Sequence, residues 1–363
     1  MNKQIPKISV LMSVYNGSRY LRESVESILN QTFTDFEFVI INDASTDNTW
    51  EILAEYAKKD ARIILIQNQE NLGLTKSLNK GLKIVKAEYI ARQDADDVSL
   101  PERLAKQVSL LDRYPNIALV SCDIEYVDFE GYLIGKDQNV CSPELVGWYL
   151  LFYNRVAGHS QVIFRRELVI NLNGYCERYR YSQDYELWCR IIKVSQIYIL
   201  PEVLLKQRRH KKSISFAKAS EQEVYLLTQV KHNIGQLIER EITIEEAKYL
   251  NKFWMKNWDI LSFQTRQKAK IIHNITKEIF HASLQKNVFG REISYQLRII
   301  IGNQFITWLP FLNNQLLAKI FVFFYALHWY PLGVLKYVYR GIKNLLSRTF
   351  VRFFFKENIK FNT

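Results

Sequence analysis

Short apolar runs alternate with longer segments of mixed polarity in the first quarter of the chain. The apolar runs are rich in Ile and Val, as buried strands are, and lie at residues 8–14, 36–41, 63–67 and 89–91. The segments between them have the start signals and polarity of surface helices, at about 18–30, 45–58 and 74–86. This alternation predicts an α/β fold, with an open, mostly parallel sheet and helices on both of its faces.

The last part of the chain has a different pattern. Apolar positions recur at helical spacing between Val224 and Ile238, which favours helices over residues 216–300. Residues 320–335 are uncharged, but this run is shorter than the ~20 residues of a membrane-spanning helix, and Pro331 interrupts it. Beyond it, apolar residues three and four apart predict a basic amphipathic helix. We expect this helix to bind an anionic membrane surface; the alternative is a helical hairpin packed on the rest of the protein.

Charge divides the chain into two regions. The 363 residues are 48% hydrophobic and 24% charged, which is typical of a globular protein. Residues 1–215 carry 28 Lys and Arg against 27 Asp and Glu, whereas residues 216–363 carry 21 against 10. Between residues 293 and 356 there is no acidic residue. A neutral region joined to a basic, aromatic one argues against a nucleic-acid-binding protein and favours a membrane surface as partner.

Cysteine usage and the first residues bear on the compartment. Cys122, Cys141, Cys176 and Cys189 are scattered without a close pair, so reduced thiols are expected rather than a disulfide framework or a zinc site. The first residues show no apolar stretch of the length that a secretory signal needs. Both features predict a cytoplasmic protein.

Polar residues follow the predicted strands at the points where such sheets bind ligands. Tyr15 follows the first strand, Asp43 the second, and residues 93–97 the fourth. Asp94 and Asp96 can both turn toward a hard divalent cation, Mn²⁺ or Mg²⁺, which takes oxygen ligands. The alternative is a solvated turn that caps the next helix. Neither a P-loop nor a G-x-G-x-x-G motif follows the first strand, so neither ATPase nor dinucleotide chemistry is indicated.

Several motifs follow one another in a definite order. Within residues 8–104 they are ISVLMSVYNGSRYLRESVESILNQTFTDFEFVIINDASTDNT, NLGLTKSLNKGL and ARQDADDVSLPERL, followed by GHSQVIFRRE, YSQDYELWCR and QRRHKKSIS. In these motifs the sequence resembles the family 2 glycosyltransferases of GT-A fold, inverting enzymes that use nucleotide sugars. The resemblance implies a GT-A catalytic domain over 1–215. The apolar spacing and charge described above predict a helical extension over 216–300 and a basic, membrane-associating helical tail over 301–363.

The resemblance implies a nucleotide site on the first strands. Ser13 and Tyr15 match the positions that hold uridine, Tyr15 by stacking on the base. Asp43 matches the carboxylate that accepts a hydrogen bond from the uracil N–H. Lys76 is the candidate for a diphosphate contact, because Leu78 stands where many relatives have arginine. An exposed helical lysine without a function is the alternative for Lys76.

The resemblance also implies a metal site. Asp94 and Asp96 match the D-x-D motif, with Asp96 as the direct metal ligand and Asp94 on both the metal and the nucleotide sugar. His210 lies among basic residues where the family often has histidine, and is a further candidate for closing over the diphosphate or joining the metal. Asp97 is expected to cap or orient the loop.

The later motifs imply the base and an acceptor contact. Asp184 matches the second acidic residue of the family's E-D motif, the catalytic base, although Gln183 stands at its first position. Glu186 is the alternative base, and a helix cap is the alternative role of Asp184. His159 is expected to contact the acceptor.

Together these positions imply an inverting, metal-dependent glycosyltransferase on the cytoplasmic face of a membrane. It would transfer a sugar from a nucleotide sugar, first of all a UDP-sugar, to a hydroxyl of a lipid-linked saccharide in surface polysaccharide biosynthesis. Two other functions compete with this one. A sugar-phosphate nucleotidyltransferase shares the fold and the metal, but it has a Gly- and Arg-rich loop that YNGSRYL lacks. A non-catalytic, membrane-bound partner in a synthesis complex is the other.

Overall fold

The computed structural model describes residues 5–137, 142–211, 213–261, 265–286, 288, 291–312, 315–341 and 343. The chain separates into two compact units, Met1–Asn233 and Ile234–Thr363. The first unit contains a nine-stranded mixed sheet with helices, and the described part of the second is helical. The predicted functional boundaries after residues 215 and 300 stay predictions.

The four strands expected from the apolar runs are present in the first unit. They are β1 (Ile8–Val14), β2 (Phe36–Asn42), β3 (Ile63–Gln67) and β4 (Tyr89–Arg92). They lie side by side in the order β3-β2-β1-β4, and all three pairings are parallel. Every residue of β1 and β4 is buried, because these strands are covered on both faces. The predicted α/β class is therefore confirmed.

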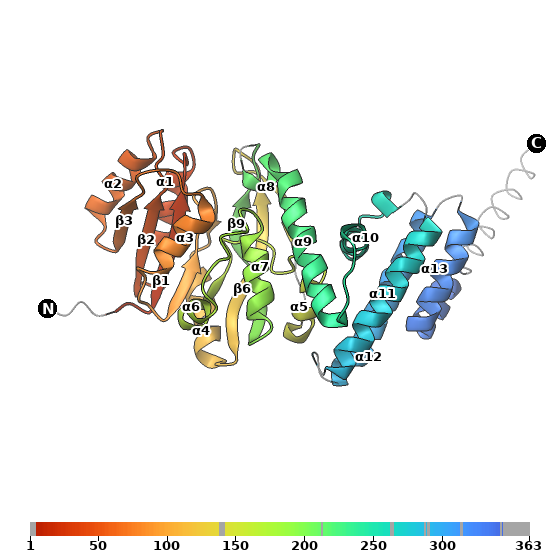
Figure 1. Ribbon diagram of the computed structural model, residues 1–363. Coiled ribbons are helices and arrows are strands. Elements are labelled where there is room, and N and C mark those ends of the chain that lie inside the picture. Colours follow the sequence, from red (N-terminus) through yellow and green to blue (C-terminus); the bar gives the residue numbers. More distant parts are fainter. Residues whose placement is uncertain are drawn as a thin grey trace, which may run out of the picture. The chain divides into compact units, whose positions relative to one another are not determined.

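Helices cover both faces of this parallel half of the sheet (Figure 1). They are α1 (Leu21–Leu29), α2 (Thr49–Lys59), α3 (Leu74–Leu82) and α4 (Arg103–Arg113). On one face, α1, α2 and α4 share a buried core with alternate residues of β1 and β2. On the other face, α3 approaches so closely that a Cβ on Gly81 would lie 2.3 Å from Leu11 Cδ1. Glycine at this position is thus a packing requirement.

The other half of the sheet contains longer strands that the apolar runs did not predict. Its elements are β5 (Val98–Ser99), β6 (Ile117–Val127), β7 (Leu133–Asp137), β8 (Ile163–Arg165) and β9 (Gln196–Arg208), with helices α5 (Pro143–Leu150), α6 (Arg166–Asn171) and α7 (Gln183–Ile191). β8 is antiparallel to both β4 and β6, and β9 runs parallel to β6. The sheet is therefore mixed rather than uniformly parallel.

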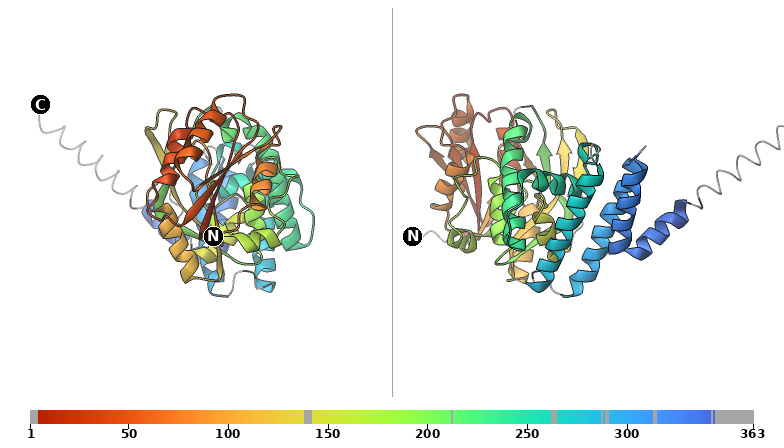
Figure 2. Two further views of the ribbon diagram at one scale, coloured as in Figure 1. Left: turned by 90° about the vertical axis from the view of Figure 1, so that its left-hand side faces the viewer. Right: turned by 45° about the vertical axis from the view of Figure 1, so that its right-hand side comes forward.

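The chain continues as helices, as the apolar spacing predicted. They are α8 (Ile214–Ala217), α9 (Ala219–Ile238), α10 (Ile244–Trp254), α11 (Thr265–Gln285), α12 (Arg291–Trp308) and α13 (Leu316–Trp329), with short 3₁₀ turns at Asp259–Leu261 and Leu309–Phe311. Thr243 and Glu246 form a capping box at the start of α10. In the second unit, α11, α12 and α13 lie side by side (Figures 1 and 2). Phe253 and Trp258 pack against Trp308 with ring centroids 5.6 and 5.8 Å away.

The helix within the uncharged run ends just before Pro331, as this proline predicts. α13 stops at Trp329, and a further helical segment begins at Pro331 and covers residues 331–341. No helix in the described part of the chain has both the length and the apolar character for crossing a membrane. Most of the predicted amphipathic helix, from residue 344 on, lies outside the described residues.

Candidate active site

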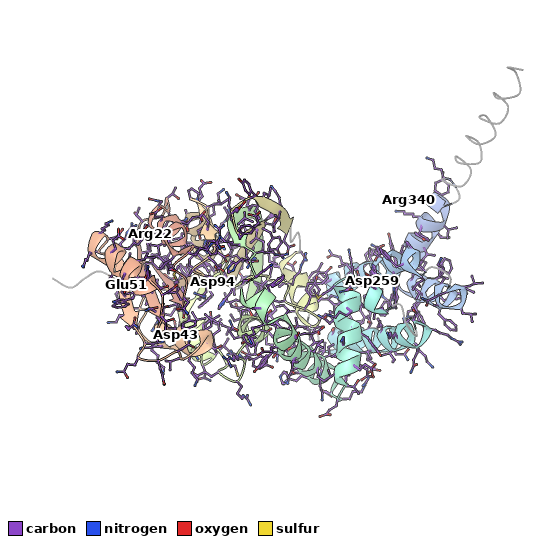
Figure 3. All side chains as sticks on the ribbon, turned by 90° about the horizontal axis from the view of Figure 1, so that it is seen from above. Arg22, Asp43, Glu51, Asp94, Asp259 and Arg340 are labelled. Atoms are coloured by element: carbon purple, nitrogen blue, oxygen red, sulfur yellow. The ribbon has the colours of Figure 1, made fainter. Side chains whose placement is uncertain are left out.

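The exits of β1, β2 and β4 meet at one edge of the sheet. Parallel pairing puts Val14 beside Asn42 and Leu11 beside Arg92, so the residues that follow these strands are neighbours. Ser13 is buried within β1, whereas Tyr15 just beyond it is 51% exposed. Both Asp43 and Asp94 lie in the first unit (Figure 3). The structure thus brings together the polar residues at the first two predicted strand exits and the acidic loop.

Backbone strain gathers at the loops that border this edge. Asn16, Ala44 and Ser182 adopt positive φ angles of 51°, 57° and 56°, which residues other than glycine rarely do. Asn16 ties two of the loops together, since its N–H donates to Ser45 Oγ (2.9 Å) and its Oδ1 accepts from Thr46 N–H (2.8 Å). Such strain persists only where surrounding contacts hold it, and it concentrates at functional sites.

Asp43 is 2% exposed and has protein partners for both carboxylate oxygens. Oδ1 accepts from Asn68 Nδ2 (2.7 Å) and from Leu72 N–H (2.9 Å), and Oδ2 accepts from Gly73 N–H (2.9 Å). Asp43 thereby anchors the loop that leads into α3. A carboxylate oxygen has room for a second donor, so these bonds leave a base contact open. Lys76, on α3, is exposed.

Asp94 is held by two neighbours. Arg92 Nη2 donates to Asp94 Oδ1 at 2.6 Å, and the backbone N–H of Asp94 donates to Ser160 Oγ at 2.6 Å. Burial raises the pKa of Asp94, and the positive charge of Arg92 acts against that rise. Arg92 was not among the predicted site residues. An arginine at the end of an apolar strand is the signal in the sequence that could have indicated it.

Asp96 and His210 form the part of the site that best suits a cation. Asp96 Oδ2 lies 2.9 Å from His210 Nε2, and the Asp96 side chain is 30% exposed. Carboxylate oxygen and imidazole nitrogen are both ligands of Mn²⁺. Burial raises the pKa of neighbouring Asp97 well above its ordinary value, and the carboxylates of Asp96 and Asp94 add to that rise. A bound cation would relieve this repulsion. The donor set therefore fits a divalent metal, although the described residues contain no preformed group of three protein ligands.

Arg208 ties the acidic loop to α1 and is 4% exposed. Its N–H donates to Asp97 Oδ1 at 3.0 Å, and its Nε donates to the carbonyl of Asp96 at 3.2 Å. Its Nη2 bonds Glu23 on α1, and its guanidinium lies 4.5 Å from the centre of the Tyr20 ring. Arg208 therefore holds the loop beside α1. From the sequence, Arg208 could be recognised only as one of several basic residues near His210.

Asp184 is the second residue of α7, which begins after Ser182. Asn154 Nδ2 donates to Asp184 Oδ2 at 3.0 Å. Burial raises the pKa of Asp184 to about 6, and the charge of Asp94 adds to the rise. At neutral pH the group is thus an ionised carboxylate with increased basicity, as a general base requires. The alternative base, Glu186, is engaged with Arg190 through both carboxylate oxygens at 2.7 Å.

His159 lies behind Asp94 rather than at the surface. Its ring is 6% exposed, and its Nε2 lies 3.2 Å from Arg92 Nε and 2.7 Å from the Tyr175 hydroxyl. Burial, together with the charge of Arg92, holds the pKa of His159 well below its usual range. The structure therefore brings His159 together with the acidic loop. Its predicted contact with the acceptor stays a prediction.

Residues 9–171 match the family described as Glycosyl transferase family 2. An uncharacterized glycosyltransferase of Haemophilus influenzae is 30% identical over 315 residues, which make up 83% of this chain and 88% of that protein. The chain belongs to the family 2 glycosyltransferases. The O-antigen biosynthesis glycosyltransferase WbnJ of Escherichia coli is 35% identical over 212 residues, 57% of this glycosyltransferase and 81% of WbnJ.

A solved structure supports the same fold. It is the mannosyltransferase PcManGT of Pyrobaculum calidifontis in complex with GDP-mannose and Mn²⁺, which matches with a TM-score of 0.50 and 17% identity. The match covers 89% of this glycosyltransferase and 86% of PcManGT. At this identity the likeness concerns the fold, which is the predicted GT-A fold followed by a helical C-terminal region.

Proposed function

We propose that this glycosyltransferase transfers a sugar from a nucleotide sugar to a hydroxyl of a lipid-linked saccharide, with inversion at the anomeric carbon. Surface polysaccharide biosynthesis is the proposed setting, which the similarity to an O-antigen enzyme supports. The observation that carries the proposal is that the first unit holds Asp43, Asp96 and Asp184 in three different environments, with Asp184 close enough to Asp94 for that charge to raise its pKa. Each environment suits one part of the reaction.

The nucleotide is proposed to lie against Ser13, Tyr15 and Asp43. An exposed aromatic side chain at the strand exit offers a face for a flat base, and the Asp43 carboxylate can accept from a ring N–H. These features support uridine, whose imide has a single N–H. Guanine also offers N–H donors, so GDP-sugars are the alternative donors. Exposed Lys76 is proposed to approach the diphosphate.

Asp96 and His210 are proposed to hold Mn²⁺ or Mg²⁺, with Asp94 beside them. The ion supplies charge neutralisation for the departing diphosphate when it is bound. A metal in the solved mannosyltransferase of this fold supports the assignment. Arg208 holds the backbone carbonyl of Asp96 and Arg92 holds the Asp94 carboxylate, so that the loop need not reorganise when the donor binds.

Asp184 is proposed to take the proton from the acceptor hydroxyl as that oxygen attacks the anomeric carbon. The Asn154 amide holds Oδ2, so the carboxylate has a defined orientation. A pKa of about 6 leaves it ionised at neutral pH while it remains a better base than an ordinary aspartate. A single displacement of this kind inverts the anomeric centre without a covalent intermediate on the enzyme.

The second unit is proposed to hold the enzyme on the cytoplasmic face of a membrane. Exposed apolar side chains gather on α13 and on the helical segment 331–341: Leu316, Leu317, Ile320, Phe324, Leu332, Leu335 and Tyr339. Lys319, Lys336 and Arg340 accompany them, and Figure 3 marks Arg340 on the last described helical segment. Apolar insertion with basic residues beside it is the chemistry of an interfacial helix.

Incubation with a panel of UDP-, GDP- and dTDP-sugars in Mn²⁺ tests the proposed function. We expect one donor to release its nucleoside diphosphate, and excess chelator to stop the release. Release of pyrophosphate from sugar phosphate and nucleoside triphosphate would instead assign the enzyme to nucleotidyl transfer. If the protein neither turns over a donor nor binds a nucleoside diphosphate, the result would favour a non-catalytic partner in a synthesis complex.

A further inference from the structure

A completely buried arginine stands behind the D-x-D loop. The Arg92 side chain is 0% exposed, and its Nη2 donates to Asp94 Oδ1 at 2.6 Å. Its Nη1 donates to the backbone carbonyls of Leu11 and Gln93. A guanidinium buried this deeply is stable only if its N–H groups have acceptors. The acceptors of its remaining N–H groups therefore fix the orientation of the Arg92 guanidinium.

His159 supplies one of these acceptors. Arg92 Nε lies 3.2 Å from His159 Nε2, and an arginine nitrogen can only donate. When Arg92 Nε donates to it, His159 Nε2 carries the lone pair and the ring proton is on Nδ1. The Tyr175 hydroxyl lies 2.7 Å from the same Nε2 and also contacts Arg92, so Tyr175 lies beside both partners.

The other ring nitrogen shows that packing alone does not require a histidine here. His159 Nδ1 is buried and has no hydrogen-bond partner among the described residues. A buried polar atom without a partner costs free energy that an apolar side chain of similar size would not. The imidazole of His159 therefore contributes through Nε2, which accepts the hydrogen bond from Arg92.

We propose that His159 is a positioning residue of the donor site, which holds the Arg92 guanidinium so that Arg92 holds the Asp94 carboxylate. The inference rests on the proposed assignment of the donor to this sheet edge. The next residue, Ser160, accepts the N–H of Asp94 at 2.6 Å, so one loop holds Asp94 from two sides. This role differs from the acceptor contact expected from the sequence.

Removal of the acceptor nitrogen tests the inference. In His159→Leu, Arg92 Nε loses its partner and the guanidinium turns toward another acceptor, which releases Asp94. We expect the donor KM and the Kd for the nucleoside diphosphate, measured by calorimetry in Mn²⁺, to rise about 10- to 100-fold, as loss of an outer partner of a metal site does. The acceptor KM should not change. His159→Gln, whose amide oxygen can accept from Arg92, should restore most of the donor affinity.

Phe164→Leu is the matched control. Phe164 is 0% exposed, and its ring centroid lies 6.2 Å from that of Trp188. The His159 ring lies at a similar distance from Trp188, 5.9 Å. Unlike His159, Phe164 has no polar atom in its side chain. We expect Phe164→Leu to lower Tm and to leave the donor KM at the wild-type value. If His159→Leu behaves in the same way, His159 only packs, and the inference is overturned.

Two further results separate this inference from the proposed function. A rise confined to the acceptor KM in His159→Leu would overturn the positioning role and favour an acceptor contact. A wild-type enzyme that neither binds nucleoside diphosphates nor hydrolyses nucleotide sugars would refute the proposed function itself. If His159→Leu does not fold, His159→Phe carries the test, because it keeps an aromatic ring in the site and removes the acceptor nitrogen. A raised donor KM in that variant supports the inference, and an unchanged one overturns it.

Discussion

The charges proposed to carry the function differ between the two units of this glycosyltransferase. In the first unit, arginines that are buried or partly buried pair with carboxylates: Arg92 bonds Asp94, Arg190 bonds Glu186, and Arg208 bonds Glu23. In the second unit, basic residues such as Lys336 and Arg340 stand exposed beside apolar side chains that are exposed as well.

This difference shows what each unit can do. Buried charges in hydrogen-bonded pairs hold their positions, so they can orient a donor and its diphosphate without reorganisation. Exposed cations beside exposed Leu316 (71%) and Leu335 (61%) offer attachment to an anionic, apolar boundary and little positional accuracy. We expect chemistry to depend on the first unit and attachment on the second, and substitutions can separate the two.

The largest effect is expected from the acidic loop. Asp96→Ala removes the partly exposed carboxylate that contacts His210, so the proposed metal would lose an oxygen ligand and the diphosphate its counter-charge. Donor hydrolysis should fall by about 10³-fold or more, the rate equivalent of several kcal/mol. Nucleoside diphosphate release in Mn²⁺ measures it. Glu51→Ala, at an exposed carboxylate on α2 in the same unit, should keep full activity. Full activity of Asp96→Ala would refute the metal assignment.

A second large effect separates chemistry from donor binding. Asp184→Asn keeps a side chain of the same shape but removes the basic oxygen, so the transfer rate should fall by roughly 10²–10⁴ while the donor Kd is unchanged. Glu186→Gln should mainly reduce Tm, because it weakens the two bonds to Arg190. Single-turnover transfer and calorimetry measure the two quantities. An inactive Glu186→Gln together with an active Asp184→Asn would reverse the two roles.

Attachment should respond to four charges in the second unit. Replacement of Lys319, Lys336, Arg340 and Lys343 by Gln removes cations that each contribute about 1 kcal/mol near an anionic surface, so vesicle binding should fall at least about tenfold at low salt. Co-sedimentation with vesicles that contain anionic lipid measures it. The matched control replaces four exposed lysines of the first unit: Lys58, Lys59, Lys83 and Lys86. Equal losses in both variants would mean that net charge alone governs binding.

The smallest effect concerns pH and stability. Burial raises the pKa of Asp184 from 3.8 to about 6 in the folded protein. Protonated Asp184 therefore adds to the free energy of unfolding below pH 3.8, and this contribution is lost as the pH rises to about 6. Above that pH, Asp184→Asn should be at least as stable as the wild type, while the wild-type rate should rise with pH through about 6. Tm and initial rates between pH 5 and 8 test both signs. A wild-type rate that is constant across this range would argue against Asp184 as the base.

The sequence was sufficient for the parallel half of the sheet and for the place of the acidic loop. β1 to β4 are short apolar runs, of which β1 and β4 are completely buried, and their parallel pairing brings the exits of β1, β2 and β4 to one edge. The long strands β6 and β9 were not predicted, because they carry polar residues such as Asp123 and Lys206 within their apolar pattern. Local patterns therefore predicted the short apolar strands and missed the long strands that contain charged residues.

The partners of the site residues could not be read from the sequence. Asn154 and Asp184 are 30 positions apart, and Arg208 and Asp97 are 111 apart. Which polar groups meet across such distances depends on how the strands and loops pack. The same reason explains His159, whose surroundings in the sequence gave no sign that it would be enclosed beside Arg92.

One vesicle assay tests most directly whether chemistry depends on the first unit and membrane attachment on the second. The wild type, Asp184→Asn and the variant with four Gln substitutions in the second unit are each mixed with anionic vesicles, Mn²⁺ and a nucleotide sugar, and the bound fraction and the release of nucleoside diphosphate are measured in the same sample. We predict that Asp184→Asn is bound and inactive, and that the four-Gln variant is unbound and hydrolyses the donor at the wild-type rate. A four-Gln variant that loses hydrolysis, or an Asp184→Asn that leaves the vesicles, would contradict the account.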